Sequence, residues 1–78
     1  MADIKADQVL DTKGLNCPMP VLKTKKALDG IESGKVLEVI STDAGSKSDI
    51  PALLSRLGHE LLETKENGNV ISFFIKKA

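Results

Sequence analysis

Apolar residues form two kinds of pattern along the chain, and each kind predicts a different element. Four stretches rich in β-branched and aliphatic residues predict strands. They are QVLDTK (8–13), KVLEVIS (35–41), HELLETK (59–65) and VISFFIKK (70–77). Between the strands, apolar residues recur three or four positions apart, which predicts two helices that each bury one face. The predicted order is therefore β-α-β-α-β-β.

The first predicted helix spans residues 18 to 29, and Gly30 suits the position after its last turn. The residues expected to face the core are Val21, Leu22 and Leu28, with Ile31 just beyond. This helix follows a glycine turn and has two prolines, Pro18 and Pro20, in its first turn.

The second predicted helix begins in the loop 41–49, and its start has two interpretations. Ser46 with Asp49 resembles a capping box. Ser48 as the cap would instead place Pro51 in the first turn, where a proline is tolerated. Gly58 is expected to end the helix. The core-facing residues are Ile50, Leu53, Leu54 and Leu57.

These elements predict an α/β two-layer sandwich, because each βαβ crossover places its helix on a face of the sheet. Both helices would cover one face of a mixed four-stranded sheet, leaving the other face partly solvated or free for contacts. Asn67-Gly68 is a strong tight-turn signal between the last two strands. Phe73 and Phe74 should point to opposite faces of the last strand, one of them into the core.

Length and charge limit what such a domain can do. The 78 residues predict a single domain, 1–78, with residues 1–6 as a flexible end. A chain of this size buries only about 60–65% of its unfolded surface, which leaves no room for a deep active-site cavity. Eleven basic residues balance eleven acidic ones, so any electrostatic recognition must come from local patches.

The chain contains one cysteine and one histidine, which excludes an internal disulfide and makes a Cys/His metal site unexpected. The N-terminal residues lack the apolar stretch of a secretory signal, and no stretch has transmembrane length. We therefore expect a cytoplasmic protein with no metal and no membrane partner.

The single cysteine, Cys17, stands where a loop enters the first helix, in the sequence GLNCPMP (14–20). Pro18 fits the first helical position, and Pro20 removes another N–H of the first turn and stiffens it. The N–H groups of Met19 and Val21 would then face an anion, and the positive end of the helix dipole favours a thiolate. Such a setting lowers the pKa of a thiol below its ordinary value.

A lone cysteine is also often a small buried apolar residue, so the position by itself leaves both roles open. The flanking prolines and the polar Asn16 speak against a core segment. A thioredoxin-like exchange would need a second cysteine two residues on, and that region holds Pro20 instead.

The stretch from Gly14 to Pro20 resembles the CPxP signature of the TusA/SirA-like sulfur carrier family. Other features fall where that family has similar ones, and the resemblance spans nearly the whole chain. They are the Gly34–Ser41 strand, the Thr42-Asp43 loop, the Asp49-Ile50-Pro51 helix start and the Gly58-His59 junction. The resemblance implies a two-layer α/β sandwich whose Cys17 carries sulfane sulfur as a persulfide, with no other cofactor.

That resemblance also implies the partners. A cysteine desulfurase or a rhodanese-like protein would donate the sulfur, and an acceptor protein would receive it for tRNA thiolation, molybdenum cofactor supply or sulfur oxidation. The sequence shows no acid or base beside Cys17, so whether the chain is an enzyme by itself stays open. Asn16, Pro18, Met19 and Pro20 would shape the site, and Met19 would offer an apolar contact to a partner.

Three lysines of the first helix, Lys23, Lys25 and Lys26, suggest a docking surface for an acidic partner, although charged runs are often only solvated helix faces. Direct nucleic-acid contact is disfavoured by the absence of Tyr and Trp. His59 is expected at a helix end rather than beside Cys17.

Asp43 and Asp49 flank a loop that could belong to a partner surface, and Asp49 is the expected cap of the second helix. A regulatory or interaction module in which Cys17 is structural remains the alternative function.

Overall fold

The computed structural model describes residues 5–15 and 19–78. The elements are β1 (Gln8–Thr12), α1 (Met19–Asp29), β2 (Val36–Ser41), α2 (Ser46–Leu57), β3 (Glu60–Asn67) and β4 (Val70–Lys76). The predicted β-α-β-α-β-β order is confirmed. Of the expected flexible end, residues 1–4 lie outside the described part, and residues 5 and 6 belong to no helix or strand.

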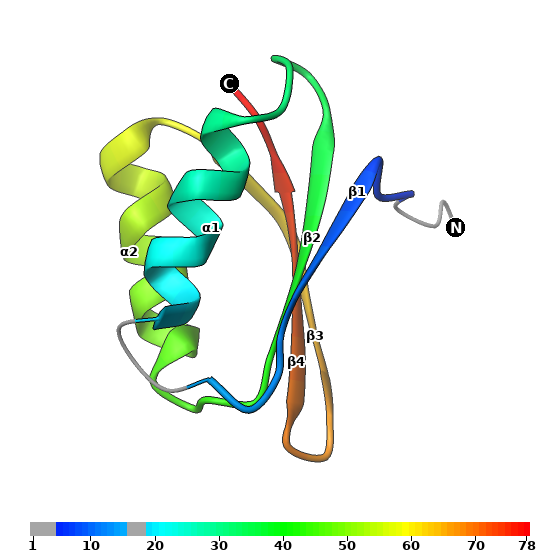
Figure 1. Cartoon of the computed structure of the whole chain (residues 1–78), viewed down its shortest axis with the longest axis vertical. Helices are drawn as coiled ribbons and strands as arrows, with labels where there is room; N and C mark the ends of the chain where they lie inside the picture. The colour runs from blue at the N-terminus through cyan, green and yellow to red at the C-terminus, as the bar shows by residue number, and fades with distance from the viewer. Residues whose placement is uncertain (1–4, 16–18) are drawn as a thin grey trace.

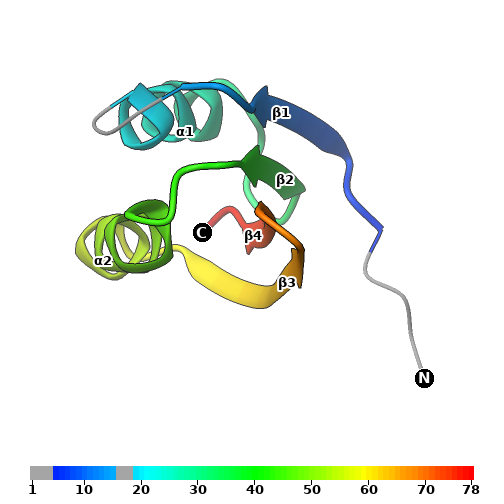
Figure 2. The ribbon, with the colours of Figure 1, turned by 90° about the horizontal axis from the view of Figure 1, so that it is seen from below.

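The four strands form one mixed sheet in the order β1-β2-β4-β3. β1 pairs with β2 in parallel, and β4 lies antiparallel to both of its neighbours. Both helices cover the same face of the sheet, and the opposite face is left open (Figures 1 and 2). The predicted two-layer sandwich is therefore confirmed, and β4 inserts between the strands that α2 connects.

The core lies between the helices and the two central strands, because alternate residues of a strand point to the same face. β2 alternates strictly between half-buried and buried positions, and its buried members face the helices. The main core cluster comprises Leu28, Leu37, Val39, Ile50, Leu54, Ile71, Phe73 and Ile75. Phe73 is fully buried there, whereas Phe74 lies on the open face at 6% exposure, so the two rings take opposite faces as expected.

Helix α1 corrects one sequence prediction. Leu22, expected in the core, is 53% exposed. The buried line of the helix is formed by Pro20, Thr24 and Leu28, which are four residues apart. Thr24 can occupy this line because its hydroxyl donates a hydrogen bond of 2.6 Å to the carbonyl of Pro20, which satisfies its polar group inside the helix.

The carbonyl groups at the C-terminal end of α1 are bonded by a side chain from outside the helix. Gly30 follows the last helical residue as predicted, but among the described residues it is not one of the glycines with positive φ. The ammonium of Lys77 donates hydrogen bonds to the carbonyls of Leu28 and Ile31. A cation at the negative end of the helix dipole is stabilising, so β4 holds α1 through the residue that follows it.

Helix α2 corrects both predicted starts. Gly45 precedes the first helical residue, so neither Ser46 nor Ser48 is the cap, and the Ser46 hydroxyl instead bonds the carbonyl of Asp43 at 2.6 Å. Pro51 lies inside the helix rather than in its first turn. Pro51 has no N–H and so removes one backbone hydrogen bond of the helix. The burial of Ile50, Leu53 and Leu54 on the same helix offsets this loss of stability.

Two glycines fix the ends of the following elements. Gly58 ends α2 in the left-handed conformation, with φ of 82°, and its N–H bonds the Leu54 carbonyl at 2.8 Å, as predicted. In the β3–β4 hairpin Asn67 pairs with Val70, so the turn residues are Gly68 and Asn69, one position later than the sequence suggested. Gly68 supplies the positive φ of 64° that this turn requires.

Candidate functional site

The segment that connects β1 to α1 contains the residues for which the sequence predicts chemistry. Asn16, Cys17 and Pro18 lie outside the described residues, so their predicted roles stay predictions. The structure describes both flanks of this segment, up to residue 15 and from residue 19. These flanks show where the segment is attached and what surrounds its attachment points.

The flank after β1 is tied to the neighbouring β2–α2 loop. Gly14 has φ of 83°, a left-handed conformation that favours glycine, and its N–H bonds the hydroxyl of Thr42 at 2.9 Å. The N–H of Leu15 bonds the carbonyl of Thr12 at 3.1 Å. Because β1 and β2 are parallel neighbours, the loops at their carboxyl ends meet, and the chain enters the segment from a tight, anchored turn.

The flank at α1 is anchored by burial. Met19 begins the helix and Pro20 follows as a fully buried residue, so the expected stiffening role of Pro20 in the first turn fits its position. The first turn carries no acidic residue that would offset the positive end of the helix dipole. This helix start therefore favours an anionic group near it.

The outward face of α1 joins apolar and basic side chains. Met19 and Leu22, three positions apart, are 40% and 53% exposed. Lys23, Lys25 and Lys26 are also exposed, and none of the three forms an ion pair with a described residue. These five residues are called the α1 docking face below.

The sequence predicts four of these five residues as partner contacts and places Leu22 in the core. The helical spacing of Met19, Leu22 and Lys26 was the available signal, because residues three or four apart share a face. With Leu22 on the outside, an apolar pair and a group of lysines lie directly after the segment that holds the single cysteine. Their use as a docking surface remains a prediction.

His59 lies at the other end of the molecule from the start of α1. It follows Gly58 at the end of α2, which Figure 1 shows opposite the first turn of α1. Its Nδ1 accepts a hydrogen bond of 3.0 Å from the N–H of Ala78, while its backbone N–H bonds the Leu54 carbonyl. The expected helix-end position is confirmed, with the backbone and not the imidazole bonding the last carbonyls.

The loop before α2 is ordered by Asp43. Its carboxylate accepts the N–H of Gly45 at 3.1 Å, and its own N–H bonds the Ser41 hydroxyl at 3.1 Å. Asp49 is the fourth helical residue rather than the cap, in the first turn where a carboxylate favours the dipole. Within the described ranges, no group of three or more metal-ligating side chains occurs.

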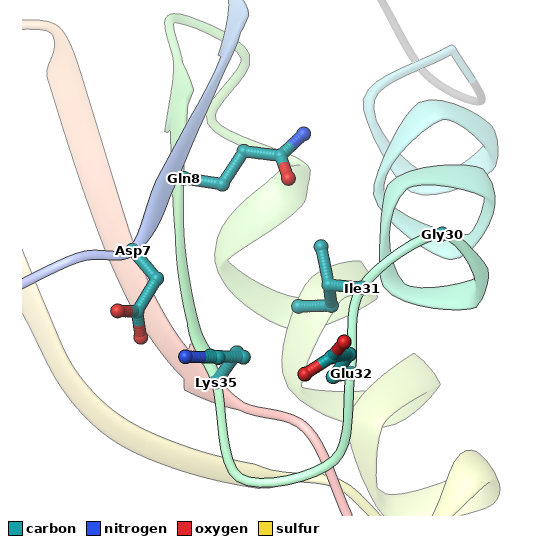
Figure 3. Close-up of a pocket in the computed structure, with 6 residues that line it drawn as sticks. All are labelled: Asp7, Gln8, Gly30, Ile31, Glu32 and Lys35. Atoms are coloured by element: carbon teal, nitrogen blue, oxygen red, sulfur yellow. The ribbon is translucent and has the colours of Figure 1, made fainter.

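Two surface hollows are lined entirely by residues that the structure describes. The larger, of about 340 Å³, lies between the start of β1 and the end of α1, away from the cysteine segment. Figure 3 shows its lining, in which the Lys35 ammonium points toward the side of Asp7 while Ile31 and Glu32 come from the loop after α1. The smaller, of about 170 Å³, is lined by residues that include Thr42 and Lys47.

Comparisons with known proteins agree on one family. The family model described as Sulfurtransferase TusA matches residues 8–77. The chain is 51% identical over 78 residues to the Sulfur carrier protein TusA of Allochromatium vinosum, covering 100% of both chains. It is 50% identical over 74 residues to the Putative sulfur carrier protein YrkI of Bacillus subtilis, covering 95% of this chain and 99% of that protein.

A solved structure supports the fold. The crystal structure of a SirA-like protein from Desulfitobacterium hafniense superposes with a TM-score of 0.78 at 28% identity, covering 88% of this chain and 95% of that one. The likeness extends over both helices and the sheet together, so the two-layer arrangement is common to the two proteins. No helix in the described part of the chain is long and apolar enough to cross a membrane.

Proposed function

Because this chain belongs to the TusA sulfurtransferase family, we propose that it is a sulfur carrier whose Cys17 holds sulfane sulfur as a persulfide. The observation that carries the proposal is the match of the family over residues 8–77, which includes the only thiol of the chain. The relatives' names describe sulfur carriers, and a carrier needs one nucleophilic sulfur of its own.

The proposed transfer exchanges one sulfur–sulfur bond for another. The Cys17 thiolate attacks the outer sulfur of a donor persulfide, the sulfur–sulfur bond of the donor breaks, and the donor cysteine leaves as a thiolate. Cys17 then carries the persulfide anion, and an acceptor thiolate repeats the same displacement. No external oxidant or reductant is consumed, because each step conserves the number of sulfur–sulfur bonds.

Two features of the chain suit such a carrier. Cys17 has no second cysteine in its own chain that could attack the persulfide and discharge it as a disulfide. The start of α1 carries no acidic residue in its first turn, so the positive end of the helix dipole stabilises a thiolate or persulfide placed before it. Donor and acceptor proteins would supply the remaining chemistry.

The α1 docking face would receive those partners. Its lysines suit an acidic surface, and Met19 and Leu22 supply the apolar contact that an interface centre requires. Donor and acceptor would bind in turn, since both must reach the same sulfur. The candidate donors are a cysteine desulfurase or a rhodanese-like protein, and the acceptor would lead to tRNA thiolation, molybdenum cofactor supply or sulfur oxidation in the cytoplasm.

Intact-protein mass spectrometry tests the proposal. The protein is incubated with a cysteine desulfurase and cysteine, and separately with a rhodanese and thiosulfate. We expect a gain of one sulfur atom that a reductant removes and that is missing in Cys17→Ser. The variant must keep the circular dichroism spectrum of the parent protein. A sulfur gain that persists in Cys17→Ser, or no gain with either donor, would refute the assignment.

Alkylation distinguishes the carrier from an interaction module with a structural cysteine. The carrier requires a Cys17 thiol that iodoacetamide modifies in the folded protein, at a rate still substantial below neutral pH. A thiol that reacts only after unfolding would favour the module. Alkylation and sulfur loading both require access to the Cys17 thiol. A folded protein whose thiol is protected from alkylation should therefore also fail to gain sulfur.

A further inference from the structure

The open face of the sheet joins apolar and acidic side chains in a row that crosses all four strands. Val9, Glu38, Phe74 and Glu63 are successive cross-strand partners on β1, β2, β4 and β3. In the two antiparallel pairs of this row, Glu38 with Phe74 and Phe74 with Glu63, the Cβ atoms are expected about 4.5–5.5 Å apart. Phe74 therefore stands between Glu38 and Glu63 in this row, and Val9, 55% exposed, lies beyond Glu38 on the edge strand.

A cation already occupies the outer side of the Phe74 ring. The Lys65 ammonium lies 5.3 Å from the centroid of the Phe74 ring, within the range of a cation–π interaction. The same ammonium is 3.6 Å from a carboxylate oxygen of Glu63. Both Lys65 and Glu63 are about half exposed, so this pair is screened by water and exchangeable.

The charges of this face differ in sign from those of the α1 docking face. Its acidic side chains outnumber its basic ones, and its half-buried apolar residues include Ile40 and Val70. By strand alternation and register, the charged side chains on the open face are Asp11, Glu38, Glu60, Glu63, Lys65 and Lys76. A second copy packed face to face would bring like charges together, and an acidic partner would be repelled.

We propose that the open face is a second docking surface, for a basic segment of a partner protein whose arginine or lysine displaces Lys65 from the Phe74 ring and lies between Glu38 and Glu63. Apolar side chains of the same segment would cover Val9 and Ile40. The face lies opposite the helices, so its occupation leaves α1 accessible (Figure 2). A carrier could then be held by one protein while Cys17 exchanges sulfur with another, and the surface itself does not depend on the sulfur chemistry.

The probe is the acetylated peptide Leu-Arg-Leu-Arg-Leu-amide, titrated into the ¹⁵N-labelled protein and followed by NMR at low salt. We expect saturable shifts at amides of β2, β3 and β4 that include Glu38 and Phe74, and weaker binding in 0.5 M salt, where charges are screened within a few ångströms. The peptide with glutamate in place of arginine should not bind. Shifts confined to the helices, or equal binding of both peptides, would overturn the proposal.

Charge variants locate the site. Glu38→Gln should weaken binding about twofold to fivefold, the effect of one exposed ion pair. Glu66→Gln is the matched control, because it removes the same charge from the helix side of β3, where Glu66 pairs with Lys47 at 2.9 Å, and it should leave binding unchanged. Equal weakening by the two variants would mean that peptide binding depends only on the net charge of the protein, which would contradict a defined site on the open face.

Two lysine variants test the role of the ring. Lys65→Gln frees the ring and Glu63, whereas Lys76→Gln removes the same charge from the same face without uncovering Phe74. We expect tighter binding for Lys65→Gln than for Lys76→Gln. Equal tightening would refute the position over Phe74. Analytical ultracentrifugation of the protein alone tests whether a second copy of the chain occupies this face instead. Self-association that Glu38→Lys abolishes would show that it does and would overturn the proposal.

Discussion

Replacing Leu22 by alanine should cost much less stability than the same replacement at Leu28 on the same helix. Leu28 is fully buried in the main core cluster. Truncation of such a leucine removes its burial and leaves a cavity, which together cost about 2–5 kcal/mol. Full burial of a leucine side chain contributes about 1.5–3 kcal/mol.

The corresponding figure for Leu22 follows from its exposure. Because 53% of Leu22 remains exposed, less than half of that contribution, below about 1.4 kcal/mol, is available to lose. Alanine also favours a helix slightly more than leucine, which offsets part of the loss.

Urea unfolding followed by circular dichroism measures both variants. The two curves should share the slope of the parent protein, so that the difference in midpoint reports stability alone. A loss for Leu22→Ala as large as that for Leu28→Ala would refute the placement of Leu22 on the surface. In the sulfur-loading assay, Leu22→Ala should slow transfer from the donor, because its side chain belongs to the α1 docking face.

The remaining predictions concern charge, backbone conformation and the anchored turn. Lys25→Glu combined with Lys26→Glu should slow sulfur loading and reduce its sensitivity to salt, whereas Lys35→Glu, at the far end of the domain, should not; equal slowing would contradict docking on α1. Gly58→Ala should lower the free energy of unfolding in urea by about 1–2 kcal/mol, because alanine disfavours the φ of 82° found there. No atom lies within 4 Å of an added Cβ, so the loss would come from the backbone conformation alone. Unchanged stability would contradict the left-handed conformation. Thr42→Val should cost about 0.5–1.5 kcal/mol and speed hydrogen exchange of the Gly14 amide, which bonds the Thr42 hydroxyl; an unchanged exchange rate would contradict that hydrogen bond.

The elements could be predicted from the sequence because their signals are local. The apolar runs of β2 and β4 and the left-handed glycine after α2 depend on residues close together in the chain. The place of β4 between β2 and β3 depends on pairing between distant segments, which no local pattern contains. Pro51 misled the prediction of the α2 start, because the burial of neighbouring residues outweighs the bond that the proline removes.

The candidate site was predictable to a different extent. The motif around Cys17 was recognisable from the sequence alone, while its geometry lies outside the described residues. The exposure of Leu22 was not predictable from hydrophobicity. Thr24 occupies the buried line instead, because the carbonyl of Pro20 accepts its hydroxyl, and a hydrogen bond of this kind lets a polar residue replace an apolar one in the core.

The overall neutrality of the chain conceals a separation of charge that only the fold reveals. α1 carries three lysines and one aspartate. The open face of the sheet carries four acidic side chains and two lysines, which by register are Asp11, Glu38, Glu60, Glu63, Lys65 and Lys76. Because the helices and the open sheet face lie on opposite sides, partners of opposite charge would be directed to different faces of the same small domain (Figure 2). Raised salt should therefore weaken binding at both faces, although the two partners differ in sign. A charge reversal on α1 should slow sulfur loading and leave binding of the basic peptide to the sheet unchanged. Glu38→Gln should weaken binding of that peptide and leave sulfur loading unchanged.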